Sequence, residues 1–395
     1  MVNYDGLYNK EYFGDKLVEN RLSERRLNFQ IVEKGTILPF RYIDINGRLM
    51  AMGGVLDSFG NFIENTSVHE GIGGSYNTGE KISERPETVI FLGTFNHVWG
   101  HCLTDHVKRI WFLESEVYKK YFFDCDIVCG IMGGGIITNF VKLLKIVGVD
   151  VQKLKLITRP TKFKNVILPD PSFYGKSSPY TVFTKEYIQF TEKVKNFSRK
   201  HLTPLSDKKF YFYHGAKQIG EERLANYFHS KGYAVVQPEK LPLETQLNIL
   251  ANCESFVSTV GSISHNTIFL KDKTEAILIP RFDNLNSFQI ALNQINDINV
   301  FYIDSSISIF TKGMHEGIFC YILSENLRKH FGDEITEKYT DEDFATFLAY
   351  VHYSKSQGLN ENPQVREYLK NIFPEFMEQL KTRKELLQKF GIVIK

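Results

Sequence analysis

The sequence predicts an α/β protein, and three observations support this class. Short apolar runs alternate with amphipathic stretches from residue 88 to about residue 280. Gly-rich turns or polar loops follow the apolar runs, as expected of parallel strand–loop–helix units. The 395 residues are 43% hydrophobic and 24% charged, which is ordinary for globular proteins and provides apolar material for at least two domains.

The first half of the chain opens with short β-like runs and then alternates between strand and helix. Two runs before residue 85, at 37–42 and 49–52, are separated by Gly-rich turns. From residue 88 the apolar runs have the length of buried parallel strands, and the stretches between them have helical periodicity. The strands expected here are 89–92, 126–129 and 154–158, and the expected helices run from Gly100 to about Val117 and over 136–147.

Five prolines mark the segment 160–208, which also contains a charged helix at about 184–200. Stretches of this kind are typical of linkers, so we expect the segment to join two domains. Beyond it, strands and helices alternate in the most regular Rossmann-like pattern of the chain. The expected strands are 210–213, 234–237, 256–260 and 276–280, and the expected helices are 221–230 and 243–252, with a loop at 261–266.

The chain from residue 340 onward is predicted to be helical. Thr340 and Asp343 have the spacing of a capping box, and apolar residues recur at helical spacing behind them. The final helix, 374–390, is basic and amphipathic; we expect it to pack across the two domains, with a membrane surface as the alternative. The predicted domains are 1–185, 205–330 and a helical tail at 331–395.

Charge, chain start and cysteines exclude several classes of protein. The 48 basic and 46 acidic residues give a net charge of +2, which argues against nucleic acid as a partner. The start of the chain has no apolar leader pattern and no run of about 18 apolar residues occurs, so we expect a cytoplasmic chain, soluble or peripheral at the inner membrane face. Cys125 and Cys129 lack the spacing of a redox or zinc pair, and we expect all five cysteines to be reduced, mostly buried thiols.

The first candidate site lies between residues 96 and 106, where a strand ends and a helix begins. His101 and Asp105 are four residues apart and share a helix face, so a carboxylate beside an imidazole is a candidate general base. Asn96 and His97 would line the same crevice. Two alternatives remain open: an ion pair between Asp105 and Arg109, and a metal site. The metal site would use His97, His101, Asp105 and His106.

A second candidate is the loop 261–266, which again leads from a strand into a helix. Gly261 would let the backbone approach a ligand, and Ser262, Ser264 and the free amides of the helix start would then hold phosphate oxygens. The alternative is an ordinary tight turn with a capping residue.

The third candidate follows the strand 210–213, where His214 and Lys217 could neutralise a diphosphate. An exposed loop lysine is the alternative for Lys217. The glycines at 133–135 lack the spacing of a phosphate-binding loop and are interpreted as a turn.

Taken together, these stretches resemble glycosyltransferase family 61, a group related to capsular polysaccharide biosynthesis. One part of the resemblance is the pattern Asn-x-x-x-x-His-x-x-x-Asp at Asn96, His101 and Asp105. The other runs through about 70 residues, 209–280, and includes Glu244-Thr245-Gln246 and the stretch from Gly261 to Asn266-x-Ile-Phe-Leu.

The resemblance implies a GT-B-like architecture, with two Rossmann-type domains that face a cleft. The C-terminal domain would bind a nucleotide-sugar donor and the N-terminal domain a hydroxyl of a surface glycan of the capsule or lipopolysaccharide type. Transfer would invert the anomeric carbon without a metal or other cofactor. Asp105, assisted by His101, would be the general base. The donor-binding residues would be His214, Lys217, Gln246, Gly261, Ser262, Ser264, His265 and Asn266.

The sequence also departs from this family. Family members commonly have an arginine where this chain has His214, further arginines near Lys217, and a histidine where it has Val260. The departures leave a second hypothesis open, a non-catalytic scaffold or binding protein of a polysaccharide assembly complex. A third hypothesis, a metal-dependent hydrolase, would use His97, His101 and Asp105.

Overall fold

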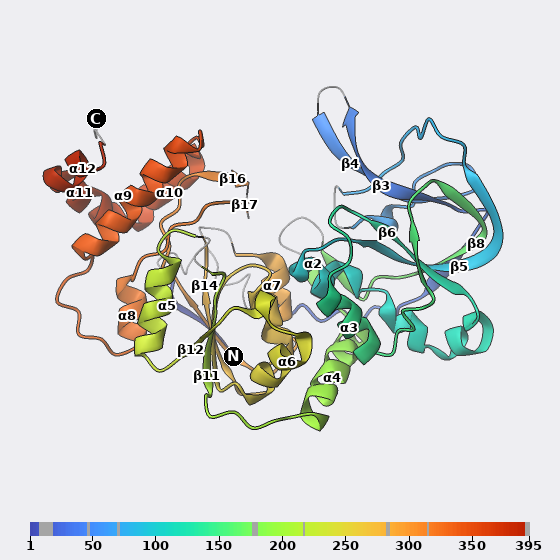
Figure 1. Ribbon diagram of the computed structural model, residues 1–395, viewed down its shortest axis with the longest axis horizontal. Helices are drawn as coiled ribbons and strands as arrows, with labels where there is room; N and C mark the ends of the chain where they lie inside the picture. Colours follow the sequence, from blue (N-terminus) through green and yellow to red (C-terminus); the bar gives the residue numbers. More distant parts are fainter. Residues whose placement is uncertain are drawn as a thin grey trace. The chain divides into compact units, whose positions relative to one another are not determined.

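The computed structural model describes residues 1–7, 19–45, 48–68, 72–175, 181–215, 218–281, 285–313 and 316–391. The chain forms two compact units (Figure 1). The N-terminal unit comprises Asn20–His201, and the C-terminal unit comprises Met1–Glu19 together with Leu202–Lys395. Both units are mixed α/β structures, as the sequence predicts.

The N-terminal unit is built on a seven-stranded mixed sheet. Its strands lie in the order β4-β3-β8-β5-β6-β7, and β2 also pairs with β8. The neighbours β8, β5, β6 and β7 are mutually parallel, whereas β2, β3 and β4 pair antiparallel. The strands are β2 (Phe29–Glu33), β3 (Thr36–Ile45), β4 (Arg48–Leu56), β5 (Ser83–Phe95), β6 (Asp126–Ile131), β7 (Leu154–Ile157) and β8 (Thr161–Pro169). All five strands expected before residue 160 are therefore confirmed.

Segment 160–208 is not a linker over most of its length. Its first part is β8, a central strand, because the apolar residues Val166, Ile167 and Leu168 are fully buried in the sheet. The short strands β9 (Phe173–Gly175) and β10 (Thr181–Phe183) follow, and the expected charged helix is confirmed as α4 (Lys185–Lys200). Prolines therefore mark the ends of β8 rather than a flexible connection.

The expected helix after Gly100 is broken into short turns. These are α2 (Trp99–His101), a π-helical turn η2 (Cys102–His106), η3 (Ile110–Glu114) and η4 (Tyr118–Phe122). Lys108 and Arg109 are buried and donate to backbone carbonyls of other segments, which draws the chain out of regular helical geometry between η2 and η3. The remaining helical elements of the unit are η1 (Glu64–Thr66) and α3 (Thr138–Ile146).

The C-terminal unit is built on a fully parallel six-stranded sheet in the order β12-β11-β13-β14-β15-β1. Counted from β11, this is the flavodoxin-like order 2-1-3-4-5, with one more strand at the end. That strand is β1 (Val2–Gly6), so the first residues lie in this sheet and not with the rest of segment 1–185. The others are β11 (Lys209–Phe212), β12 (Ala234–Val236), β13 (Ser255–Thr259), β14 (Glu275–Ile279) and β15 (Asn299–Ile303).

Helices cover both faces of this sheet (Figure 1). On one face, α5 (Glu221–Ser230) and α8 (Glu325–His330) pack with Tyr211, Val257 and Ile277. The other face is covered by α6 (Leu243–Asn252) and α7 (Ser287–Leu292). The short helices η5 (Pro238–Lys240) and η6 (Ser264–Phe269) connect strands and helices. From β11 to β13, the strands and helices match the expected boundaries within two residues.

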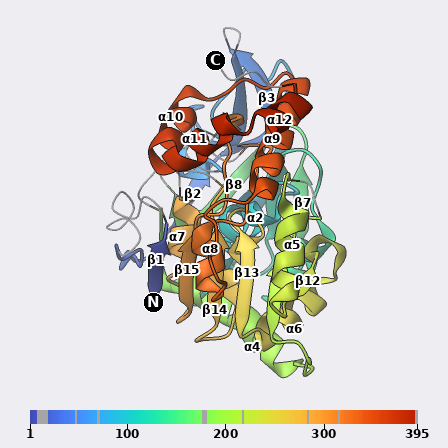
Figure 2. The same cartoon turned by 90° about the vertical axis from the view of Figure 1, so that its left-hand side faces the viewer.

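The tail of the chain is helical and packs within the C-terminal unit (Figure 2). Thr340 and Asp343 form the predicted capping box of α9 (Asp341–Ser356). The expected last helix is two helices, α11 (Pro374–Thr382) and α12 (Lys384–Lys389), which follow α10 (Pro363–Ile372). Their apolar residues Phe376, Leu380 and Leu387 are buried in a core shared with α9, so this apolar face is covered inside the protein. The strands β16 (Thr311–Gly313) and β17 (Glu316–Gly317) form a small hairpin before it.

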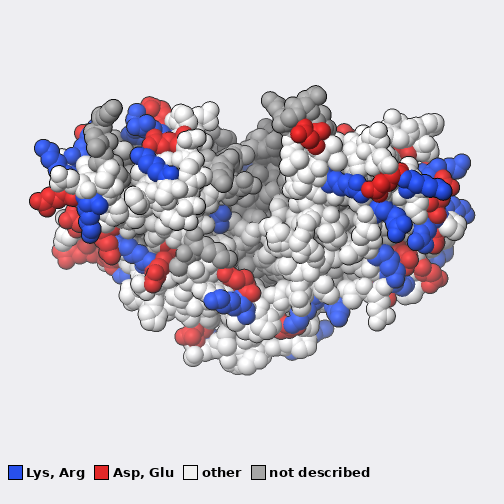
Figure 3. All heavy atoms as spheres, turned by 45° about the horizontal axis from the view of Figure 1, so that its top comes forward, with Lys and Arg blue, Asp and Glu red and all other residues white. Residues whose placement is uncertain are grey.

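The surface and the cysteines agree with the composition. Acidic and basic side chains are interspersed in the view of Figure 3, in keeping with the net charge of +2. All five cysteines are unpaired, and four of them are buried. Within the described ranges, no helix combines the length and the apolar character needed to cross a membrane.

Candidate active site

The N-terminal unit brings His101 and Asp105 together at the carboxyl end of β5. His101 Nδ1 lies 2.6 Å from Asp105 Oδ2. Both residues belong to the helical turns that start four residues after β5 ends, with Leu103 and Val107 buried on the packing side. The π-helical turn at 102–106 keeps the two side chains on one face, as the spacing predicts; such turns are frequent at functional sites.

The two members of this pair differ in their access to solvent. The Asp105 side chain is 5% exposed, whereas that of His101 is 28% exposed. Asp105 Oδ2 also accepts a hydrogen bond from the Thr104 hydroxyl at 3.1 Å. A carboxylate can only accept, so the contact with His101 puts a proton on Nδ1 and leaves Nε2 of a neutral imidazole as an acceptor. Asp105 thus orients the ring, and His101 is the member that a ligand can reach.

Lys108 adds a buried cation behind the carboxylate. Its Nζ lies 3.9 Å from Asp105 Oδ1 and donates to the carbonyls of Ser67 at 3.2 Å and Val68 at 2.5 Å. Burial lowers the pKa of Lys108 to about 7, partly offset by the attraction of Asp105. The charge of the Lys108 side chain, which lies behind the His101–Asp105 pair, therefore changes near neutral pH.

The neighbouring predicted residues take different roles. Burial lowers the pKa of His106 to about 3, and its Nε2 accepts from the Asn96 backbone N–H at 3.2 Å, so His106 is a neutral core histidine. Asn96 is buried, its Oδ1 accepts from the Val98 N–H, and its Nδ2 has no hydrogen-bond partner. His97 is exposed and lies over Gly134, where a β-carbon would stand 2.1 Å from the His97 ring.

The observed contacts bear on the two alternatives for this segment, an ion pair between Asp105 and Arg109 and a metal site. Arg109 does not pair with Asp105: its Nε donates to the Pro169 carbonyl at 2.9 Å, another guanidinium nitrogen donates to the Asn65 carbonyl, and Nη1 has no partner. In the part of the chain that the structure describes, no three His, Cys, Asp or Glu side chains are grouped to hold a metal ion.

In the C-terminal unit, the bend at Gly261 follows β13. Its φ is +152°, a conformation that favours glycine. The Ser264 hydroxyl contacts both the N–H and the carbonyl of Gly261, at 3.0 and 2.7 Å. Gln289 Oε1 lies 2.6 Å from Ser264 Oγ and 2.8 Å from His265 Nδ1, and Asn266 donates to the Ile263 carbonyl at 2.8 Å.

This geometry corrects one expectation about the bend. The helix after it, η6, is a six-residue 3-10 turn, and the amides of Gly261 and Ser264 are already bonded within the bend. They are not free to hold phosphate oxygens. Ser264, His265 and Asn266 are buried and fix the shape of the bend, whereas Gly261 and Ser262 are partly exposed.

Arg281, which the sequence analysis did not single out, lies across the bend. A β-carbon on Gly261 would stand 2.5 Å from Arg281 Nη2, so the glycine makes room for this guanidinium. Arg281 Nη2 also lies 3.4 Å from His214 Nε2, and the guanidinium is 4.9 Å from the centre of the Phe319 ring. Arg281 follows Pro280 at the carboxyl end of β14, and the strand-end rule that selected His214 and Gly261 would have found it.

These residues meet at the switch point of the sheet. β11 is the first strand of the Rossmann-like pattern, with β12 on one side and β13 on the other, so the loops after β11 and β13 diverge at this point. Ligands of open α/β sheets bind in the crevice formed there. His214 and Gly261 follow these two strands, and Arg281 follows the next one.

Gln246, a further predicted donor residue, has other surroundings. The Gln246 side chain is buried and donates to the carbonyls of Pro238 at 2.7 Å and Leu241 at 3.0 Å, which closes the turn before α6. Lys217 lies outside the described residues. Glu221 is fully buried, its Oε1 accepts from the His214 N–H at 3.1 Å, and burial raises its pKa.

The comparison with protein-family models agrees with the resemblance seen in the sequence. The family model described as "Glycosyltransferase 61" matches residues 99–277, from α2 to β14. Curated proteins give no match. Among solved structures, the chain is similar to a bacterial iron-containing dodecameric glycosyltransferase, TibC, from enterotoxigenic E. coli, with 9% identity and a TM-score of 0.24 over 68% of this chain and 84% of that one.

The matched segment contains the His101–Asp105 pair, His214 and the bend at Gly261, although not Arg281. Residues 99–277 match the model of glycosyltransferase family 61, and this match supports a glycosyltransferase activity.

Proposed function

We propose that the chain transfers a sugar from a nucleotide-sugar donor to a hydroxyl of a surface glycan of the capsule or lipopolysaccharide type, with inversion of the anomeric carbon. The observation that carries the proposal is the 2.6 Å contact between His101 and Asp105 at a strand end inside the family 61 segment. A partly exposed imidazole held by a buried carboxylate is suited to removing a proton from a hydroxyl.

In the proposed reaction the His101–Asp105 pair acts as the general base. The acceptor hydroxyl gives its proton to His101 Nε2 while its oxygen bonds to the anomeric carbon on the face opposite the departing group. The bond from that carbon to the diphosphate oxygen breaks, and the nucleoside diphosphate leaves with the electron pair. Asp105 accepts from His101 Nδ1 throughout and stabilises the imidazolium that forms. The direct proton acceptor is then His101, and Asp105 acts through it.

The donor diphosphate would bind at the switch point of the C-terminal sheet. Arg281 is the described cation nearest to the Gly261 bend and is positively charged at physiological pH. Its guanidinium and the Ser262 hydroxyl could donate to phosphate oxygens and stabilise the charge on the leaving group. Arg281 would thereby take the place of the family arginine where this chain has His214. Lys217, Gln246, Ser264, His265 and Asn266 remain predicted parts of the donor site.

The same proposal extends to architecture and location. A GT-B-like arrangement would present the carboxyl edges of both sheets to one shared cleft, with Asn96 and His97 on the acceptor side. We propose a cytoplasmic site of action, with peripheral contact to the inner membrane or to an assembly complex, and a reaction that needs no metal or other cofactor.

A donor panel tests the proposal. The purified chain is incubated with nucleotide sugars of different bases and sugars, with and without a strong chelator, and release of nucleoside diphosphate is measured beside calorimetric titration of the nucleotides. We expect one donor class to be consumed at a rate that the chelator does not change. Binding of nucleotides without turnover of any donor would favour the non-catalytic scaffold, and loss of activity with the chelator would favour a metal-dependent enzyme.

A further inference from the structure

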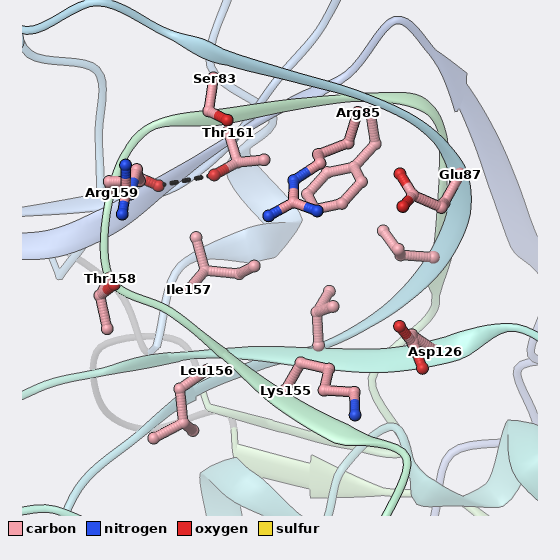
Figure 4. A pocket seen from close by; sticks show the side chains of 13 residues that line it. Ser83, Arg85, Glu87, Asp126, Lys155, Leu156, Ile157, Thr158, Arg159 and Thr161 are labelled. Atoms are coloured by element: carbon pink, nitrogen blue, oxygen red, sulfur yellow. Dashed lines mark hydrogen bonds between the residues drawn. The ribbon is translucent and has the colours of Figure 1, made fainter.

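The N-terminal unit contains a pocket of about 430 Å³ whose lining includes neither His101 nor Asp105. Its walls come from β5, β6, β7 and β8 and from the turn that joins β7 to β8 (Figure 4). The volume falls in the range of sites for small ligands. Nothing in the proposed transfer reaction uses this pocket.

The pairing of the strands explains why a pocket forms here. β5 pairs with β8 from Ser83 onward, but it pairs with β6 only from Val89, where Asp126 begins β6. The first six residues of β5 therefore have no partner strand on the β6 side, and the β7–β8 turn closes the gap. Side chains at every second position of β5 point into it.

The bottom of the pocket is apolar and its rim is polar. Val89, Val128, Ile157 and Phe163 are buried members of the core of the unit. The rim has side chains of both charges and three hydroxyls, and all five charged residues are exposed. Figure 4 shows Arg85 extending into the pocket from β5. The polar lining residues are Ser83, Arg85, Glu87, Asp126, Lys155, Thr158, Arg159 and Thr161.

The charged groups of the rim do not neutralise one another. Arg85, Glu87, Asp126 and Arg159 form no ion pair with any residue in the described part of the chain. Among the described residues, Lys155 Nζ donates only to the Gln152 carbonyl, at 3.3 Å. An anionic ligand would meet the two carboxylates, and a cationic ligand would meet the three basic groups. A ligand rich in hydroxyls satisfies both, because a hydroxyl donates to a carboxylate and accepts from a guanidinium or ammonium.

We infer that this pocket is a second glycan-binding site, which takes one or two sugar units of an oligosaccharide with their polar edges toward the rim and their C–H face on the apolar bottom. The inference rests on the proposed function, because a glycan acceptor is the polyhydroxylated substrate of the proposed reaction. The lining of the pocket is separate from the His101–Asp105 pair, so the pocket would hold sugar units of an acceptor or product other than the reacting one.

Oligosaccharide binding without any donor tests the inference separately from catalysis. The probes are an array of neutral, amino-sugar, uronic-acid and phosphate-bearing oligosaccharides, followed by calorimetry with each one that binds. The variants are Arg85→Gln and Asp126→Asn, both on exposed rim residues, and the matched control is Lys164→Gln on β8, next to Phe163 and on the opposite face of the strand. Thermal melts establish that all variants are folded.

We expect the wild-type chain to bind at least one neutral or amino-sugar oligosaccharide. Each rim variant should weaken binding about tenfold, as for loss of a hydrogen bond to a charged group, and Lys164→Gln should leave it unchanged. The inference is overturned if no probe binds at millimolar concentration, or if the rim variants bind like the wild type. It is also overturned if inorganic phosphate displaces the probe and Asp126→Asn tightens binding, since the pocket would then be an anion site. Binding with the expected losses in a chain that consumes no donor would retain the pocket and contradict the proposed transfer.

Discussion

The Arg281 guanidinium lies over Gly261 so closely that a β-carbon there would stand 2.5 Å from Nη2. Arg281 follows β14 and Gly261 follows β13, so the contact ties two neighbouring strand ends of the parallel sheet together. Arg281 forms no ion pair with a carboxylate among the described residues, and its Nε has no hydrogen-bond partner. A fixed cation with unused donors is thus available at the switch point.

Replacing Arg281 with Ala should weaken donor binding more than it slows the chemical step. Loss of one charge-assisted contact to a diphosphate corresponds to about 1.5–3 kcal/mol, or a rise in the donor Kd of about tenfold or more. Calorimetry with the nucleoside diphosphate measures this directly. The control is Lys271→Ala, because Lys271 is a half-exposed cation that follows η6. This variant should bind the nucleoside diphosphate like the wild type. Equal affinity of Arg281→Ala and wild type would remove Arg281 from the donor site.

Replacing Gly261 with Ala should act through Arg281. The new methyl group would displace the guanidinium, and the φ of +152° adds backbone strain of about 1–3 kcal/mol. We expect Gly261→Ala to melt at a lower temperature and to lose donor affinity. In the double variant with Arg281→Ala, the loss of affinity should be less than the sum of the single effects, because both changes remove the same contact. Additive losses would contradict this coupling.

Much of this fold could be predicted from the sequence, because buried parallel strands are short apolar runs whose limits are set by local composition. The runs at 89–92 and 256–260 are examples, and both lie inside observed strands. β8 was missed because Pro160 and Pro169 flank it, and prolines at strand ends resemble those of a linker. The assignment of β1 depends on a partner, β15, almost 300 residues away, which no local pattern reveals.

The candidate site was predictable to a similar extent. The His101–Asp105 contact follows from spacing on a helical turn, so the sequence contains it. The accessibility of the two side chains does not follow, because it depends on Lys108 and on the backbone at 67–68 that covers Asp105. Arg281 is close to Gly261 only through the pairing of β13 with β14.

The buried Lys108 should make stability depend on pH in a defined window. Burial lowers its pKa to about 7 in the folded chain, from an ordinary value of 10.5. Between these values the unfolded chain binds a proton that the folded chain has released, so the free energy of unfolding rises with pH by up to about 1.4 kcal/mol per unit. Below the folded pKa both states are protonated and the contribution is constant.

Lys108→Met provides the comparison, because methionine has similar length and no charge. Urea unfolding of both proteins at about pH 7 and about pH 9.5 should show the wild type gaining stability relative to the variant as pH rises. The difference isolates Lys108 from the other titrating groups. Parallel changes in the two proteins would show that Lys108 keeps its proton across this range in the folded chain.

The strongest test of the His101–Asp105 pair compares Asp105→Asn with His101→Gln. An asparagine at 105 keeps the size of the side chain but offers an amide donor to His101 Nδ1, which favours the tautomer with a proton on Nε2 and removes the base. We expect both variants to lose about a hundredfold or more in kcat, the scale of a lost general base, while the donor Kd stays unchanged. Because the two residues act as one unit, the double variant should be no slower than either single variant.

Glu116→Gln, on an exposed side chain of the same segment, controls for the loss of an acidic group and should retain full activity. If Asp105→Asn instead unfolds at lower temperature and its folded fraction turns over donor at the wild-type rate, the carboxylate serves the fold alone and another group must accept the proton.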